Sequence, residues 1–275
     1  MTRPHVTIRF ERDGSVGWLR LDRPDRLNAF TVEMWREVRE LGEELRDDPD
    51  LRALVVIGEG RAFSSGIDTS VFAGPLGDDL GAGPDAGTRD EDPVIDSIMR
   101  TQDSFTWLEE APYATIAAVR GYALGAGLQL ALACDLRVIA EGTKVGLLEF
   151  KYGILPDLGG TQRLPRLVGA AKAKELIFTA TQIDADEALR IGLVERLVPD
   201  TELEPTVRDL AATIAAQPPL AVQGAKRAVN VAGTMPTRDG LRVEAEGQAV
   251  CLRSDDMKEA IAAFVERRTP DYQRR

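Results

Sequence analysis

The chain has 275 residues, 44% of them hydrophobic and 29% charged, and its formal net charge is −11. This acidic balance argues against a nucleic acid or an anionic membrane surface as the main partner. The sequence contains no uninterrupted run of about 18 apolar residues, the length that a membrane span needs, and its first residues lack the apolar core of a signal peptide. We therefore expect no membrane association and a cytoplasmic location.

The single histidine, His5, and the two cysteines, Cys134 and Cys251, restrict the chemistry that the protein can perform. A Ser-His-Asp triad, a Cys-His pair and a His-ligated zinc all need a histidine in the core of the fold, whereas His5 lies in a predicted tail. Two cysteines in apolar helical contexts make neither a disulfide framework nor a thiolate metal site. We expect no bound metal, and we expect carboxylates to carry any acid–base chemistry.

The N-terminal third predicts a hairpin, a helix and a buried strand. Residues 6–22 alternate apolar and polar side chains around an Asp-Gly turn, which is typical of a β-hairpin. Thr31 is suited to cap a helix whose apolar residues recur at helical spacing until 47–49 end it. Residues 54–57 are a short continuous apolar run, which is typical of a buried strand.

That strand leads into a loop with small residues at 60–68, where backbone can approach a ligand closely. Residues 73–93 are rich in Gly, Pro and Asp and have little to bury, so we expect a flexible loop. Apolar residues then recur at helical spacing over 94–108, which predicts an amphipathic helix.

The stretch 120–130 is the centre of the chain. A strand-like run, 115–119, leads into it through three glycines, and a helix-like run, 128–134, leads out. Such a turn leaves backbone N–H groups at the start of a helix without partners, and the helix dipole adds partial positive charge there. The stretch is therefore suited to bind a negative oxygen.

The predicted secondary structure changes near residue 204. Before it, strand and helix patterns alternate, over a strand at 135–140, a glycine-punctuated loop at 152–160 and helices at 170–180 and 184–191. After it, nearly all residues favour helix, and Ser254 caps the last helix. We expect an α/β core over 1–203 and a helical C-terminal region over 204–275.

Three motifs, in the correct order, resemble the crotonase superfamily, which is the enoyl-CoA hydratase/isomerase family. They are residues 60–68 (GRAFSSGID), 121–127 (GYALGAG) and 159–164 (GGTQRL), and the resemblance runs from about Val6 to Tyr272. Neither of the first two is a Walker A loop, because no Gly-Lys-Ser/Thr follows. The resemblance implies a spiral of ββα units and a C-terminal helical region that builds homotrimers or dimers of trimers.

The resemblance also implies an acyl-CoA thioester as substrate and no separate cofactor, since coenzyme A is part of that substrate. The thioester carbonyl is expected between two backbone N–H groups, which by motif position belong to Ser65 and Ala126. Gly66, Ile67 and Gly125 beside them are expected to contact the substrate. Hydration or double-bond migration puts negative charge on the thioester oxygen, and each fixed donor to such an oxygen is worth roughly 10²–10³ in rate.

The acid–base residues depart from the pattern of the hydratases, in which two glutamates flank the water. One of these positions is Glu149, and the other is Gln129, which cannot transfer a proton in the ordinary way but could position a water. Asp157 lies eight residues after Glu149, a spacing similar to the carboxylate pair of dienoyl-CoA isomerases. Two carboxylates in an apolar pocket have their pKa values pushed apart, so that one serves as acid and one as base.

Binding of the coenzyme A part of the substrate needs cations near its phosphates and backbone atoms that approach its adenine closely. Arg26 matches a family position near the CoA phosphates, and Arg61 and Ala62 match the loop beside the adenine. Phe264 and Arg267 match positions that close over CoA from a neighbouring subunit.

Three interpretations remain open from the sequence. The protein is an enoyl-CoA hydratase or isomerase that stabilises a thioester enolate, with Glu149 as main acid/base. Alternatively, Glu149 and Asp157 form a proton shuttle like that of a dienoyl-CoA isomerase. Loss of a carboxylate at Gln129 also permits a non-catalytic acyl-CoA-binding paralogue.

Overall fold

The computed structural model describes residues 5–73 and 92–275, so most of the loop predicted at 73–93 lies outside the described residues. The strands are β1 (Ile8–Asp13), β2 (Val16–Leu21), β3 (Ala53–Gly58), β4 (Ala114–Val119), β5 (Tyr122–Leu124), β6 (Leu136–Ala140), β7 (Lys144–Gly146), β8 (Ile183–Asp184) and β9 (Arg196–Val198). The α-helices are α1 (Val32–Leu45), α2 (Pro93–Glu110), α3 (Ala126–Ala133), α4 (Gly160–Val168), α5 (Ala170–Thr179), α6 (Ala185–Arg190), α7 (Leu203–Ala215), α8 (Pro219–Val231), α9 (Thr237–Arg253) and α10 (Asp255–Glu266). The short 3-10 helices are η1 (Pro24–Arg26), η2 (Thr69–Ala73), η3 (Glu149–Tyr152) and η4 (Asp200–Glu202).

A six-stranded sheet in the order β1-β2-β3-β4-β6-β9 forms the centre of the fold. The hairpin β1–β2 is antiparallel, as predicted, and the other pairs in this sheet are parallel. One row of side chains across it, Trp18, Val55 and Ile116, belongs to the core beneath α7. The alternate positions Leu19 and Val56 belong to the larger core with α1 and α2. Both faces of the sheet are covered, which explains the continuous apolar runs in β3 and β4.

A smaller sheet, in the order β5-β7-β8, brings two later segments together. Strands β5 and β7 are parallel, with Leu124 opposite Gly146. The N–H of Gly125 continues this pairing by donating to the carbonyl of Gly146 over 2.8 Å. Strand β5 leads into α3 and β7 leads toward η3, so the start of α3 and the residue Glu149 come to lie next to each other.

The predicted cap and the predicted apolar stripe are both found in helix α1. The Thr31 hydroxyl accepts a hydrogen bond from the N–H of Met34 over 3.3 Å, which satisfies one of the free donors of the first turn. Phe30 stacks on Trp35 with ring centroids 5.9 Å apart, and it meets Phe105 of α2 edge-on at 5.3 Å. These aromatic contacts join α1 to α2 over the sheet.

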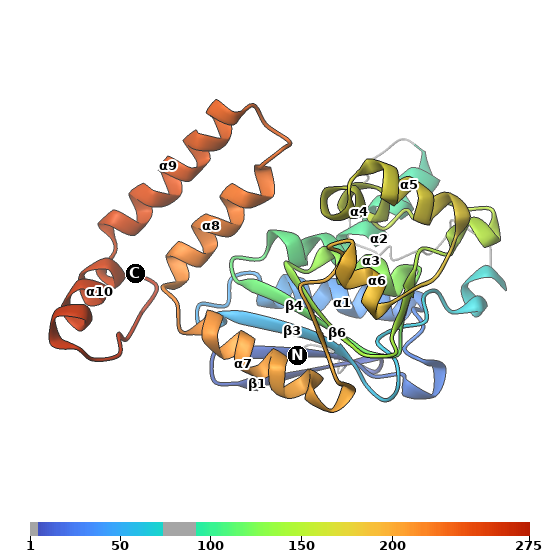
Figure 1. Cartoon of the computed structure of the whole chain (residues 1–275), viewed down its shortest axis with the longest axis horizontal. Coiled ribbons are helices and arrows are strands. Elements are labelled where there is room, and N and C mark those ends of the chain that lie inside the picture. Colours follow the sequence, from blue (N-terminus) through green and yellow to red (C-terminus); the bar gives the residue numbers. More distant parts are fainter. Residues whose placement is uncertain (1–4, 74–91) are drawn as a thin grey trace.

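The four C-terminal helices divide into two groups. Helix α7 lies under the sheet, where Leu203 and Val207 are fully buried, whereas α8, α9 and α10 extend away from the core (Figure 1). The region that begins at residue 204 therefore starts within a helix that packs on the sheet. Among the described residues, no helix has both the length and the apolar composition that a bilayer span requires.

The extension carries many exposed apolar side chains. Its helices α8 and α9 run side by side (Figure 1), and Phe264 and Val265 of α10 are 85% and 74% exposed. Lys226 of α8 ties the extension to the core through an ion pair of 2.8 Å with Asp135. An apolar surface of this kind on a single chain is typical of a site that another protein surface covers.

Candidate active site

An apolar pocket of about 310 Å³ lies at the edge of the sheet where β3 and β4 end. Three chain segments line it: residues 65–67 after β3, residues 124–126 after β5 and parts of 148–158 after β7. Side chains from α1 and α2, including Trp35 and Ile98, form another wall. The carboxyl ends of parallel strands are the usual place for ligands in α/β sheets.

The loop after β3 and the turn after β4 are held together by backbone hydrogen bonds. The Ser64 N–H donates to the Tyr122 carbonyl over 2.9 Å, and the Leu124 N–H donates to the Ser64 carbonyl over 3.0 Å. Gly66 has a φ of +101°, and a Cβ on it would lie 2.8 Å from the Leu124 carbonyl oxygen. Only glycine permits both this backbone conformation and this close approach.

The prediction that the Ser65 amide donates to the thioester oxygen is wrong, because this N–H is not free. The Ser65 N–H already donates to the carbonyl of Leu27 over 2.9 Å, and the next N–H, of Gly66, donates to the Ser64 hydroxyl over 3.2 Å. Within residues 5–73 and 92–275, the Ile67 N–H has no hydrogen-bond partner. Ser65, Gly66 and Ile67 all line the pocket, but Ile67 has the free amide.

The second expected donor, the Ala126 N–H, stands at the first position of α3. No protein group in the described part of the chain accepts from it, and the residue lines the pocket. Gly125 before it has a φ of +50° and directs the chain from β5 into the helix. The dipole of α3 adds partial positive charge at this point.

Glu149 lies beside this turn. Its side chain is buried, and a Cβ on Gly125 would lie 3.3 Å from the Glu149 Oε1 atom. The Gln129 Nε2 donates to Oε1 over 2.7 Å, while the buried Oε2 has no partner within the described residues. Burial raises the pKa of Glu149 to about 7, and the charge of Asp157 acts in the same direction, against the hydrogen bond from Gln129. Glu149 can therefore be present as acid or as base at neutral pH.

Asp157 lines the same pocket as Glu149. Burial raises the pKa of its carboxyl, and its own backbone N–H opposes that effect. The expected pair of carboxylates is thus present in one apolar cavity. Other acidic side chains do not join them in a metal site, since the described residues contain no group of three or more His, Cys, Asp or Glu that could hold an ion.

Gln129 connects the Glu149 carboxylate to the loop that carries Asp157. Its Oε1 accepts from the N–H groups of Leu158 and Gly160 over 2.8 and 2.9 Å. Only the oxygen of an amide accepts from N–H groups, so the Nε2 must face Glu149. Gln129 lines the pocket as expected, but its amide is mainly engaged with Glu149 and with the loop that carries Asp157.

The residues expected at the coenzyme A end lie in two places. Arg26 and Arg61 are exposed on loops that touch, because a Cβ on Gly60 would lie 2.9 Å from the Pro24 Cβ. Ala62, beside Arg61, is buried, and its carbonyl accepts from the Asn28 side chain.

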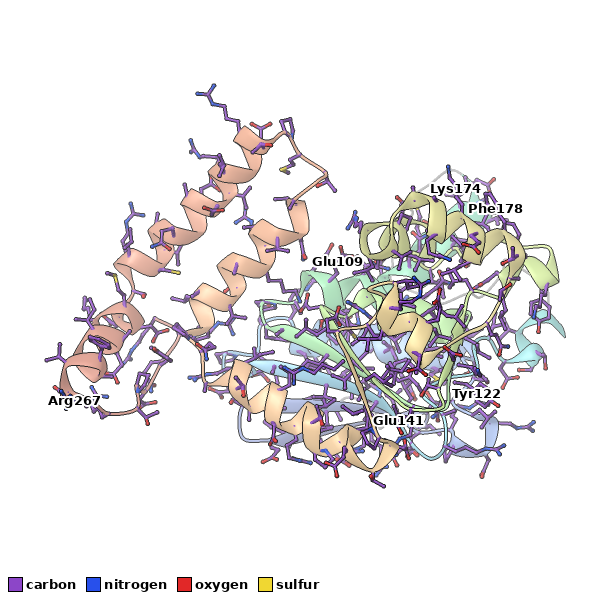
Figure 2. The ribbon with its side chains drawn as sticks, viewed as in Figure 1. Glu109, Tyr122, Glu141, Lys174, Phe178 and Arg267 are labelled. Carbon is purple, nitrogen blue, oxygen red and sulfur yellow. The ribbon has the colours of Figure 1, made fainter. Side chains whose placement is uncertain are left out.

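Phe264 and Arg267 lie on the C-terminal extension. Figure 2 shows Arg267 at its far end, well away from Tyr122 and Phe178 of the core. A single chain therefore does not bring Phe264 and Arg267 to the pocket.

Sequence patterns do not reveal the far wall of the pocket. The apolar stripe of α2 predicts core packing, yet Val94, Ile98 and Thr101 of that helix line the cavity. Trp35 is likewise a buried residue of α1 that lines the cavity. Helical periodicity identifies the inward face of such a helix, but it cannot separate residues that fill the core from residues that border a cavity.

Comparisons with known proteins identify the family of the chain. The enoyl-CoA hydratase/isomerase family model matches residues 11–275. A Mycobacterium bovis protein named "probable enoyl-CoA hydratase" is 40% identical over 274 residues, which cover 98% of this chain and 99% of that protein.

Solved structures share the fold. The enoyl-CoA hydratase of Bacillus anthracis superposes with a TM-score of 0.88 at 33% identity, covering 98% of this chain and 100% of that one. A Thermobifida fusca protein solved in complex with CoA superposes with a TM-score of 0.80 at 39% identity, covering 90% and 93%. The α/β fold predicted from the three motifs is thereby confirmed, and the chain belongs to the enoyl-CoA hydratase/isomerase family of the crotonase superfamily.

Proposed function

We propose that this enzyme binds an enoyl-CoA, stabilises the enolate of its thioester with the N–H groups of Ile67 and Ala126, and uses Glu149 as its main acid/base. The observation that carries the proposal is the place of the Glu149 carboxyl. It has a pKa raised to about 7 and stands against Gly125, the residue that precedes the Ala126 N–H. The acid–base group and the oxyanion donor thus border the same small volume.

The proposed steps follow from the negative charge that develops on the thioester oxygen. A thioester carbonyl that accepts from both N–H groups becomes more negative as a proton moves on the acyl chain or as water adds to the double bond. The two donors are fixed by backbone and need no reorganisation at that moment. The free Oε2 of Glu149 is the atom that exchanges the proton, because Oε1 already accepts from Gln129.

A second candidate reaction is favoured by Asp157. Gln129 stands where a second hydratase glutamate is expected, and its amide cannot supply a proton in the ordinary way. Asp157 provides another buried carboxyl with a raised pKa in the same pocket. A proton shuttle between Glu149 and Asp157 would move a double bond along a conjugated acyl chain. A non-catalytic acyl-CoA binder would have no need of two desolvated carboxyls.

The test is turnover of purified protein with 2-enoyl-, 3-enoyl- and 3,5-dienoyl-CoA. Hydration of the 2-enoyl ester supports the first reaction, and isomerisation of the other two supports the shuttle. Binding of all three esters without conversion of any would overturn the proposal and favour the non-catalytic interpretation. The CoA bound to the Thermobifida fusca relative supports a CoA ester as the ligand class.

We also propose that the chain assembles as a homotrimer or a dimer of trimers through α8–α10. The exposed apolar residues of this extension, with Phe264 85% exposed, support a covered surface. Phe264→Asp should therefore yield monomers and raise KM for the CoA ester by about tenfold, the loss of one apolar contact to the substrate. Phe264→Leu keeps an apolar side chain and serves as control.

Light scattering and steady-state kinetics measure both effects. If Phe264→Asp keeps the size and the KM of the wild type, this face is not the interface and Phe264 does not close over CoA.

A further inference from the structure

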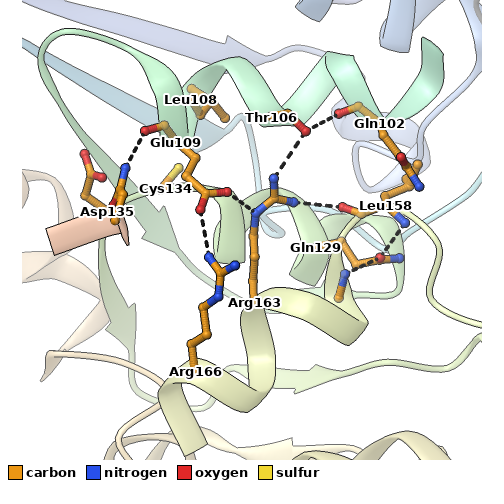
Figure 3. A network of polar contacts seen from close by, with 12 residues as sticks. Gln102, Thr106, Leu108, Glu109, Gln129, Cys134, Asp135, Leu158, Arg163 and Arg166 are labelled. Atoms are coloured by element: carbon orange, nitrogen blue, oxygen red, sulfur yellow. Dashed lines mark hydrogen bonds and ion pairs between the residues drawn. The ribbon is translucent and has the colours of Figure 1, made fainter. Parts of the chain in front are cut away.

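Arg163 is a buried arginine that the acid–base chemistry leaves without a role. It lies on α4, and its guanidinium makes three separate contacts with the core (Figure 3). Its Nε donates to Glu109 Oε2 over 2.8 Å, its Nη2 to the Thr106 hydroxyl over 3.3 Å, and its Nη1 to the Leu158 carbonyl over 3.1 Å. The first two anchor the guanidinium to α2, and the third reaches the loop that carries Asp157.

The backbone that follows the Cα of Asp157 is held by side chains from three helices. Gln102 of α2 donates to the Asp157 carbonyl over 2.7 Å, and Arg163 donates to the carbonyl of Leu158. Gln129 of α3 accepts from the N–H groups of Leu158 and Gly160. A displacement of residues 157–160 therefore breaks hydrogen bonds that are buried or that involve a charged group, and such groups are costly to leave without partners.

Gly159 is shaped to this contact. Its φ is +95°, and a Cβ on it would lie 2.0 Å from the Arg163 Nη1. A side chain at residue 159 would thus occupy the place of the guanidinium. The absence of a side chain at Gly159 therefore leaves the space that the Arg163 guanidinium occupies.

We propose that Arg163 is a positioning residue that sets the place of the Asp157 carboxyl relative to Glu149. Arg163 acts through the Leu158 peptide and touches neither carboxylate. The N–H of the same residue, Leu158, donates to Gln129, which in turn donates to Glu149. The inference rests on the proposed acid–base roles of Glu149 and Asp157. An arginine suits this task because its planar fork presents donors in fixed directions to Glu109, Thr106 and Leu158.

Arg166 provides a matched control. It contacts the same Glu109 over 3.1 Å, but from an exposed position, and its described contacts do not include the loop. Arg163→Met, Arg163→Lys and Arg166→Met can thus separate the loop contact from the ion pair with Glu109. Arg163→Lys, which keeps a positive charge beside Glu109, decides the test if Arg163→Met does not fold.

The first measurement is amide hydrogen exchange of residues 157–160, which needs no catalytic activity. Arg163→Met should accelerate exchange of the Leu158 and Gly160 amides at least about tenfold, because the loop opens locally more often. Arg163→Lys should give an intermediate rate, since its ammonium still reaches one acceptor, and Arg166→Met should match the wild type. Unchanged exchange in Arg163→Met, or in Arg163→Lys where Arg163→Met does not fold, overturns the proposal.

The second measurement is catalysis of the ester whose conversion depends on Asp157. Arg163→Met should lower kcat by about 10²-fold, the effect of a misplacement near 1 Å, with KM within about threefold. The pH limb that belongs to Asp157 should move to lower pH, because an opened loop admits water and relieves the burial that raises the pKa of Asp157.

A kcat and a pH profile equal to those of Arg166→Met overturn the positioning role. If the wild type converts no ester, the proposed function fails, while the exchange data still decide whether Arg163 holds the loop.

Discussion

Glu149→Gln is expected to lower kcat by about 10²–10⁴-fold, the contribution of a positioned acid–base group, and to leave KM for the CoA ester nearly unchanged. The substitution keeps the shape of the side chain, and a glutamine oxygen can still accept from Gln129. It removes only the group that exchanges the proton beside the Ala126 N–H. Steady-state kinetics with the converted ester measure the change, and activity close to that of the wild type would exclude Glu149 as the acid/base.

The same variant should change how stability depends on pH. The pKa of Glu149 is raised from 4.5 to about 7 in the folded chain, mainly by burial. A raised carboxyl pKa means that folding favours the protonated form, so its stabilisation is complete below pH 4.5 and is lost as pH rises through about 7. The wild type should lose free energy of unfolding between these values, relative to Glu149→Gln.

Urea denaturation at pH 5 and pH 8 measures this difference. Parallel losses in the two proteins would show that Glu149 does not titrate with a raised pKa. This outcome would leave the kinetic prediction to stand on its own.

Asp157→Asn is expected to lower isomerisation of the 3,5-dienoyl ester by about 10²-fold or more, with hydration of the 2-enoyl ester changed only a few-fold. Isomerisation along a conjugated chain needs a proton taken at one carbon and given at another, and Gln129 can do neither. Hydration beside Glu149 can proceed with water that the Gln129 amide orients. Parallel assays of the two esters measure the difference.

Asp186→Asn is the control, because Asp186 is exposed on α6 and outside the pocket. An equal loss of both reactions in Asp157→Asn would mean that the two carboxyls act together in hydration as well. No loss of isomerisation would remove the shuttle and leave Asp157 as a residue of the pocket wall.

Local chemistry makes much of this fold predictable from sequence. The Thr31 cap, the hairpin, the buried strands and the Ser254 cap depend on residues close together in the chain, and all are found. The change near residue 204, from mixed strand and helix patterns to residues that favour helix, is also local. Such a pattern does not show which surface a helix packs on. Helix α7 follows that change and still lies under the sheet, because its apolar stripe meets Trp18 and Val55.

The sequence by itself determined the family, the glycine turn before α3, the loss of a carboxylate at Gln129 and the presence of Glu149 and Asp157. These features depend only on which residue types stand at which positions, and the sequence states that directly. The tertiary structure decided which N–H groups are free, since the Ser65 amide is taken by Leu27, far away in sequence, and Ile67 is left. It also decided that Gln129 and Arg163 hold the Asp157 loop, because a hydrogen bond depends on distance in space, and folding alone sets that distance.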